Sequence, residues 1–432
     1  MFKLLKEAFQ VKEIRNKIFF TLFVLFVFRL GAQITVPGVN AAALNQLANL
    51  PFLNMLNIVS GSAMQNFSVF AMGVSPYITA SIVIQLLQMD IVPKFVEWSK
   101  QGEVGRKKLN QATRYLTIVL GFVQSIGITA GFNQLGQFGE NLVPNPSIQT
   151  YLTIGLILTT GTMIVTWMGE MITDKGIGNG VSMIIFAGII ATLPNGIHEI
   201  YLDQFVRGTT DWTNYAFVIG LIVAIIVTVA FTTFMQQAER KIPIQYTKRV
   251  TGAPTSSYLP LKVNAAGVIP VIFASSFIST PNAILQIFAQ QHADAGWYHT
   301  MTQIFDFSTA PGATIYAVLI VAFTFFYAFV QVNPEKLAEN LQKQGSYIPQ
   351  VRPGKGTEEW VSKLLMRLSV VGAIFLGLVA ILPIVATMLF DLPRAIGLGG
   401  TSLLIVIGVA LETSKQLEGL LLKRQYKGFM AK

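Results

Sequence analysis

The sequence predicts an all-α integral membrane protein with ten transmembrane helices. Of its 432 residues, 52% are hydrophobic and only 12% are charged, whereas soluble domains carry roughly 25% charged residues. Ten apolar runs are long enough to cross a hydrocarbon core of about 30 Å, although the fifth is short. These runs are residues 18–36, 75–91, 112–132, 152–172, 179–194, 215–235, 264–288, 313–332, 366–390 and 399–420. A cytosolic enzyme is therefore not expected.

The basic residues predict the orientation of the chain. All of the 31 Lys and Arg residues except Arg29, Arg207 and Arg394 fall in the two tails or in connections on the same side as the tails. Positive charge marks the cytoplasmic side of a membrane protein. We therefore expect both termini in the cytoplasm. The first span has no small-residue cleavage signature, so no removable signal peptide is expected.

Several kinds of chemistry are not expected. The chain has no cysteine, and His198, His292 and His299 fall in loops, so neither a cofactor nor a metal site is predicted. The glycine-rich stretch Gly176–Gly180 follows a membrane helix and not a strand, which favours a tight turn over a dinucleotide site. An intramembrane protease would need a Ser/His, Asp/Asp or HExxH set, and the sequence offers none. The chain is therefore not expected to be an enzyme.

The stretch from Leu30 to Met89 carries no charged residue. As one helix it would be about 90 Å long, roughly three times the thickness of the hydrocarbon core, so the chain must cross, fold back and re-enter. Within it, Asn57–Phe67 is polar but uncharged and looks too polar to form core. Such backbone persists at membrane depth only when it is buried in protein or lines a water-filled cavity. A segment inside a cavity and an exposed loop remain equal alternatives.

The scarcity of charged residues inside the spans favours a pore whose narrowest part is lined by apolar side chains. Acidic residues lie near the ends of spans, as Asp90, Glu170 and Glu412 do, or in loops. Ion-coupled transport is usually marked by ionisable residues inside the membrane, whereas hydrophobic constrictions gate by dewetting. A secondary solute transporter with inverted repeats is the alternative, and it would need polar coordination near the midplane.

The span count also predicts two pseudo-symmetric inverted halves around a central pore. Residues 1–194 would form the N-terminal half, 195–212 an external hinge and 213–432 the C-terminal half. Inverted repeats with a functional path at their interface are common in transporters.

Two basic cytoplasmic segments, residues 236–263 and 333–365, are longer than the usual connection of about 4–6 residues. Docking of a large acidic or anionic partner and simple orientation by charge account for them equally well.

Five motifs resemble the bacterial SecY family, the central channel subunit of the Sec protein translocase. They are GVSPYITASIVIQLL, GEMITDKGIGNGVSMIIFAGI, YLPLKVNAAGVIPVIFASS, GSYIPQVRPGKGT and GGTSLLIVIG, in that order. The resemblance extends from the first span to the C-terminal tail. It implies a channel that passes unfolded preproteins across the bacterial cell membrane and releases transmembrane segments sideways into lipid.

The resemblance also implies roles for individual residues. The pore ring corresponds to Val74, Ile78, Val181, Ile185, Ile272 and Ile405. A short plug helix that closes the channel from outside corresponds to Asn57, Ile58, Ser60, Gly61, Ser62, Gln65, Asn66 and Phe67. Polar residues of a lateral gate correspond to Thr79, Gln124 and Asn264. Docking of a motor or ribosome corresponds to Arg240, Lys241, Lys248, Arg249, Arg352 and Lys355.

Two ring positions are valine where isoleucine is usual, so the seal is expected to be slightly looser but still apolar. Arg240 and Lys241 stand where relatives often have two arginines. Because Lys lacks the bidentate fork of Arg, either Arg240 or Lys241 could make the main contact with a partner.

The partners implied by the resemblance are SecE and SecG in the membrane, the SecA ATPase, the ribosome, preproteins with their signal peptides, and membrane lipids. No nucleic acid is expected to bind apart from ribosomal RNA. The energy for transport would come from the motor or the ribosome.

Overall fold

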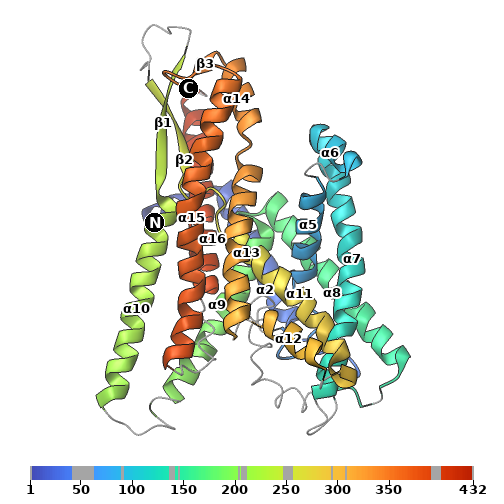
Figure 1. Cartoon of the computed structure of the whole chain (residues 1–432). Helices are drawn as coiled ribbons and strands as arrows, with labels where there is room; N and C mark the ends of the chain where they lie inside the picture. Colours follow the sequence, from blue (N-terminus) through green and yellow to red (C-terminus); the bar gives the residue numbers. More distant parts are fainter. Residues whose placement is uncertain are drawn as a thin grey trace.

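The computed structural model describes residues 2–40, 63–88, 92–135, 142–144, 146–202, 205, 212–246, 256–292, 295–306, 309–390 and 400–430. Each of the ten predicted spans contains a helix (Figure 1). These helices are α2 (Lys12–Gly31), α5 (Ser75–Leu87), α7 (Gly102–Leu135), α8 (Ile148–Lys175), α9 (Gly180–Tyr201), α10 (Trp212–Gln237), α11 (Ile269–His292), α13 (Ala310–Gln331), α15 (Lys355–Phe390) and α16 (Gly400–Met430). Within the described residues, four shorter helices accompany them: α1 (Phe2–Gln10), α6 (Pro93–Lys100), α12 (Gly296–Ile304) and α14 (Pro334–Lys343).

The fold class is confirmed as a mostly helical membrane fold. Among the described residues, six helices are long and apolar enough to cross a membrane: α7, α8, α9, α10, α13 and α15. The other four expected spans, in α2, α5, α11 and α16, are also helical. Helix α5 has only 13 residues, so it reaches across only part of a bilayer of about 30 Å at 1.5 Å per residue.

Local sequence signals explain where several helices begin. Pro76 occupies the first turn of α5, where its missing N–H costs no helical hydrogen bond. Ser147 caps α8 by accepting a hydrogen bond from the backbone N–H of Thr150 at 3.2 Å. Thr309 caps α13 in the same way through the N–H of Gly312. These side chains satisfy backbone donors that would otherwise lack partners.

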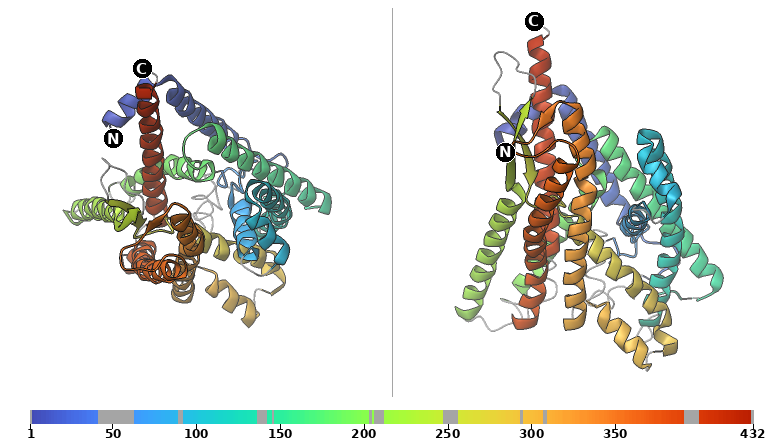
Figure 2. Two further views of the ribbon diagram at one scale, coloured as in Figure 1. Left: turned by 90° about the horizontal axis from the view of Figure 1, so that it is seen from above. Right: turned by 45° about the horizontal axis from the view of Figure 1, so that its top comes forward.

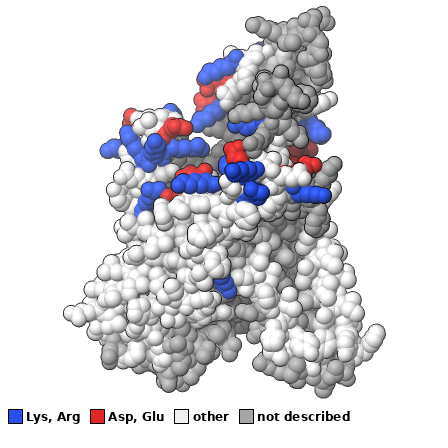
Figure 3. Space-filling model, turned by 180° about the vertical axis from the view of Figure 1, so that it is seen from behind, with Lys and Arg blue, Asp and Glu red and all other residues white. Residues whose placement is uncertain are grey.

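The helices form two groups that meet along α11. Helices α5, α7 and α8 pack together, and so do α13, α15 and α16. Helix α11 packs against α5 and α7 of the first group and against α13 of the second (Figure 1). Seen from above, the helices surround a central region (Figure 2). Charged side chains gather at the end of the molecule that carries the strands, whereas the other part of the face in Figure 3 is nearly free of them.

A small sheet is the main addition to the predicted fold. The segment 236–263, expected as a loop, contains strand β1 (Glu239–Tyr246) and strand β2 (Ser256–Lys262), which pair antiparallel. Strand β3 (Ser346–Tyr347), from the other long basic segment, pairs with β1, so the order is β2-β1-β3. The two segments share a buried cluster of Ile242, Leu261, Ile348, Val361 and Leu365. They therefore form one folded unit and not two independent loops.

An ion pair ties this unit to the last helix. The Lys415 ammonium group on α16 lies 2.8 Å from the carboxylate of Glu239 at the start of β1. The hydrogen bond from Lys415 lowers the pKa of Glu239 below its ordinary value. A carboxyl group with a lowered pKa stabilises the fold above its unfolded pKa, and this contribution is lost as the pH falls through the folded value.

The turn between α8 and α9 is the predicted tight turn Gly176–Gly180. Gly178 adopts φ +86°, which favours glycine. Its N–H donates to Gln416 Oε1 of α16 at 2.5 Å, and the N–H of Ile177 donates to Thr21 Oγ1 of α2 at 3.1 Å. The turn therefore joins the first and last spans at the charged end of the molecule.

We expect Gly161→Ala to destabilise the protein. A Cβ atom at Gly161 on α8 would lie 1.9 Å from the carbonyl oxygen of Val69, and relieving such overpacking typically costs about 1–3 kcal/mol. The matched control is Gly220→Ala on α10, where a Cβ meets nothing within 4 Å. There, alanine should be neutral or stabilise by up to about 1 kcal/mol. Thermal unfolding midpoints of the two variants test this, and equal midpoints would contradict the close approach.

Candidate functional site

Five of the six predicted ring residues come from the helices α5, α9, α11 and α16, and Val74 is the N-cap residue of α5. Their exposed fractions are 0% for Val74, 5% for Ile78, 2% for Ile185, 7% for Ile272 and 5% for Ile405, and Val181 is partly buried. All six belong to one continuous cluster of packed apolar side chains. The spacing of four residues places Val181 and Ile185 on one face of α9, and the N–H of Ile78 donates to the carbonyl oxygen of Val74 at 3.0 Å. All six side chains are therefore packed among other apolar side chains in the core of this structure.

A cavity of about 390 Å³ lies against the ring. Ile78, Val181, Ile185 and Ile272 line one part of it. The rest of its lining comes from α5, α7, α8, α9, α11 and α13, and it includes the polar side chains of Asn110, Arg114, Glu170, Asp174 and Asn179. This partly open cavity, called the vestibule below, is therefore lined by both apolar ring residues and polar side chains.

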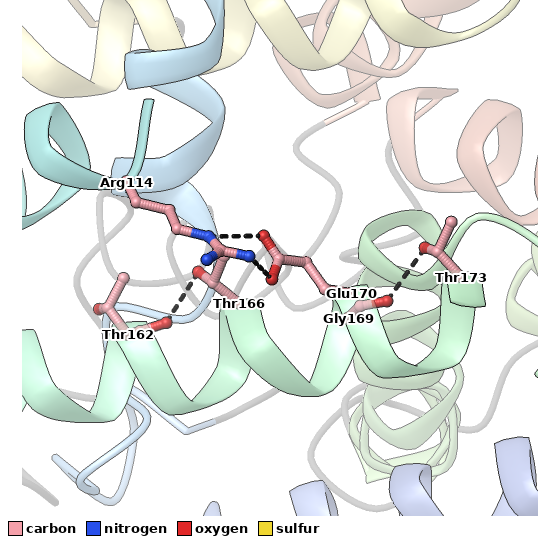
Figure 4. A network of polar contacts seen from close by, with 6 residues as sticks. All are labelled: Arg114, Thr162, Thr166, Gly169, Glu170 and Thr173. Carbon is pink, nitrogen blue, oxygen red and sulfur yellow. Dashed lines mark hydrogen bonds and ion pairs between the residues drawn. The ribbon is translucent and has the colours of Figure 1, made fainter. Parts of the chain in front are cut away.

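An ion pair projects into the vestibule. The Arg114 guanidinium group of α7 binds both carboxylate oxygens of Glu170 on α8, with 3.1 Å between Nε and Oε1 (Figure 4). The side chains of Arg114 and Glu170 are 50% and 26% exposed. A bidentate pair of this kind has a fixed geometry. Charge therefore lies beside the constriction but not within the ring.

The expected plug falls largely outside the described residues. Asn57, Ile58, Ser60, Gly61 and Ser62 lie in the segment that the structure does not describe. Of the remainder, Gln65 is exposed, and the Asn66 amide donates to Gln33 Oε1 at 3.1 Å.

Phe67 corrects one expectation about this segment. The sequence suggested that the whole stretch is too polar to join a core, but Phe67 is 0% exposed and its ring packs edge-on against Phe132. The backbone of residues 63–67 forms turns and not a helix. The expectation is wrong for these last residues because Met64 and Phe67 supply large apolar side chains to a second buried cluster.

Two of the three predicted gate residues meet at a residue that the sequence analysis missed. Thr280 Oγ1 of α11 accepts a hydrogen bond from Gln124 Nε2 of α7 at 3.0 Å. It also lies 3.3 Å from Thr79 Oγ1 of α5. This cluster joins α11 to both helices of the first group. A polar Ser-Thr pair before Pro281, within an apolar span, was the available signal for Thr280.

Asn264 lies elsewhere. It precedes α11 in the turn after β2, and its amide donates to the carbonyl oxygen of Gly267 at 2.9 Å. The structure therefore does not bring Asn264 to Thr79 and Gln124. The polar cluster therefore consists of Thr79, Gln124 and Thr280, and Asn264 is not part of it.

Four of the six predicted docking residues lie within the described part of the chain, on β1 and around the start of α15. Arg240 and Lys241 are exposed on β1, opposite Leu261 and Pro260 of β2. Arg352 is exposed before α15, and its carbonyl oxygen accepts a hydrogen bond from Thr357 Oγ1 at 3.0 Å. Lys355 begins α15. Lys248 and Arg249 lie outside the described residues.

A membrane-embedded bundle with an apolar constriction, a vestibule and a polar seam between helix groups defines the class of helical membrane channels. The SecY family model matches residues 68–414. The protein translocase subunit SecY of Lactococcus lactis subsp. lactis (strain IL1403) is 63% identical over 99% of this chain and 98% of its own length. The chain belongs to the SecY family.

Two solved structures share the fold. One, described as "The structure of a protein conducting channel", has a TM-score of 0.67 and 18% identity, and covers 93% of this chain and 91% of its own. The other, described as "Sec61 in the Canine ribosome-channel complex from the endoplasmic reticulum", has a TM-score of 0.63 and 17% identity over the same shares.

We expect Thr280→Val to loosen the contact of α11 with α5 and α7. Valine keeps the shape but removes the acceptor of Gln124, and an interhelical hydrogen bond in a membrane contributes about 0.6 kcal/mol on average. Spin labels on α7 and α11 should report a broader or longer distance distribution. Thr280→Ser should retain the wild-type distribution.

The matched control is Ser275→Ala, which removes only a hydrogen bond to Ile272 within α11. If Ser275→Ala and Thr280→Val change the distribution equally, Thr280 has no special part in joining the helix groups.

Proposed function

We propose that this protein-conducting channel passes unfolded preproteins through the ring of Val74, Ile78, Val181, Ile185, Ile272 and Ile405. The observation that carries the proposal is the closed ring of buried apolar side chains beneath an open vestibule. An apolar constriction excludes water and ions by dewetting. It offers no polar group that would hold a passing chain, so it can close around segments of any sequence. The alternative of a secondary solute transporter is not supported.

The polar cluster of Thr79, Gln124 and Thr280 would act as the lateral gate. It joins α5 and α7 to α11, and these hydrogen bonds are individually weak. Parting of the helices there would open a path from the vestibule to lipid. An apolar transmembrane segment would leave by this path because lipid solvates it better than the aqueous side does.

We further propose that the plug comprises the segment around residues 57–62, and that residues 63–67 anchor it to the core. Residues 1–194 and 213–432 would form the two inverted halves, with the hinge at 195–212. The chain would reside in the bacterial cell membrane with both termini in the cytoplasm. The positive charge of the strand-bearing end supports this orientation.

The folded unit made by the two basic segments would dock the SecA ATPase or the ribosome, and SecE and SecG would pack around the helices. The channel itself would perform no covalent chemistry, so these partners would supply the energy. Reconstitution tests the proposal: vesicles with this chain and its partners should import an unfolded preprotein with ATP but take up no small solute. Solute uptake without preprotein import would contradict it.

We expect polar substitutions in the ring to make the channel leak. Replacing Ile78, Ile185, Ile272 or Ile405 singly by Asn would allow water into the constriction, because the dewetted state needs an apolar wall. Ion conductance in planar bilayers should rise, and preproteins with weak signal sequences should be exported more readily. The control is Ile222→Asn on α10, where Ile222 is 51% exposed on the outer surface. A variant of the ring that unfolds without leaking would contradict the assignment.

We expect Arg352→Glu to insert normally but to lose most SecA-driven translocation. The substitution leaves the excess of cytoplasmic positive charge large, so the orientation should survive. Lys343→Glu is the matched control, because Lys343 is 68% exposed and pairs only within α14, with Glu339. Such a surface pair contributes at most about 1 kcal/mol. Loop accessibility and preprotein translocation should be measured for both variants. Equal defects would mean that the positive charge of these loops only orients the chain in the membrane and that Arg352 has no special part in docking.

A further inference from the structure

A second, smaller cavity lies between the base of the sheet and α16. It has a volume of about 120 Å³ and is lined by α9, α10, α13 and α16, by the end of β2 and by the turn that leads into α11. Protein interiors are otherwise close-packed. The base of the sheet and α16 are therefore separated by space across this cavity and are not pressed together by packed side chains.

Two buried polar atoms in the lining have no hydrogen-bond partner among the described residues. They are Nε2 of Gln236, at the end of α10, and Oδ1 of Asn264, in the turn before α11. A buried donor or acceptor without a partner destabilises the arrangement that buries it. The joint between α10, the sheet and α11 is therefore suited to a change of arrangement, because a shift there can give these atoms new partners.

One ion pair bridges the sheet and α16 beside this cavity. Lys415 lines the cavity, and its Nζ lies 2.8 Å from Oε1 of Glu239 at the start of β1. The next residue of α16, Gln416, accepts a hydrogen bond from the N–H of Gly178 at 2.5 Å. A single turn of α16 is therefore bound both to the sheet and to the turn between α8 and α9.

We propose that Glu239 and Lys415 are positioning residues that couple the docking of a cytoplasmic motor to the ring. Ile405 lies about 15 Å before Lys415 on the same helix, at 1.5 Å per residue. A motor that engages Arg240 and Lys241 would displace β1, and the ion pair would carry this displacement to α16 and so to Ile405. This inference rests on the proposed function, and it assigns a role to two residues outside both the ring and the proposed docking contacts.

The test separates the affinity of the motor from the transport that the motor drives. Both are measured on vesicles that contain the assembled translocase, and the preprotein translocation rate is taken at saturating motor and per folded channel. Lys415→Glu should leave the affinity unchanged and lower the rate about three- to fivefold, the upper part of the range for a partly exposed ion pair. Adding Glu239→Lys, which restores the pair with its charges exchanged, should return the rate to within about twofold of the wild type.

A covalent bridge tests the coupling in a second way. The chain has no cysteine, so Glu239→Cys and Lys415→Cys can be combined and joined by a short bifunctional maleimide. The unlinked double variant should be slow, and cross-linking should restore its rate because the bridge replaces the ion pair. Cross-linking that blocks transport would show that the two groups must separate, and it would overturn the inference.

The matched control is Glu418→Lys, a charge reversal at an exposed position of α16 that forms no ion pair with another described residue. Its affinity and rate should equal those of the wild type. The inference would be overturned by an equal fall in Glu418→Lys, by an unchanged rate in Lys415→Glu, or by a Lys415→Glu defect that lies in affinity or that Glu239→Lys does not relieve. All of these outcomes leave the channel function intact. A wild-type channel that moves no preprotein would instead overturn the proposed function and, with it, this inference.

Discussion

The mutual burial of Ile78, Ile185, Ile272 and Ile405 is the interaction on which the rest of the structure depends. These side chains come from α5, α9, α11 and α16, so the proposed seal would exist only while these four helices stay in place. Burying a large aliphatic side chain contributes about 1.5–3 kcal/mol relative to leaving it exposed. The same contacts therefore help to hold the helices together and, in the proposed function, would close the path between them.

Opening of the channel must replace this burial with other contacts that contribute a similar free energy. In the proposed function, a passing polypeptide would supply apolar contact with the ring, and an apolar segment would take the place of α5 and α7 beside α11. The hydrogen bonds at Thr280 add little to the closed state. A closed state held mainly by non-directional burial can adapt to many chains, whereas one held by directional polar bonds would select among them.

The sequence predicted the positions of the spans well and the polar details poorly. Hydropathy locates a helix wherever an apolar run is long, and it did so for all ten runs. The β-hairpin was missed because Pro243 and Pro260 stand within its strands, and proline argues against a strand unless the strand lies at an edge. Pro260 is on β2, an edge of this three-stranded sheet.

The burial of Phe67 was missed because the residues around it are polar, so the segment as a whole was expected to lie outside the core. Thr280 was missed because helix register decides which polar residue faces another helix, and a run of polar residues does not reveal that register.

The central claim is that polypeptide passes through the ring, and cross-linking of an arrested preprotein tests it most directly. The chain has no cysteine, so one introduced thiol gives an unambiguous signal. With a cysteine in the arrested segment, Ile272→Cys and Ile405→Cys should form disulfides with the preprotein, and Ile222→Cys on the outer face of α10 should not. Cross-links that form at Ile222→Cys but not at the two ring positions would contradict the account.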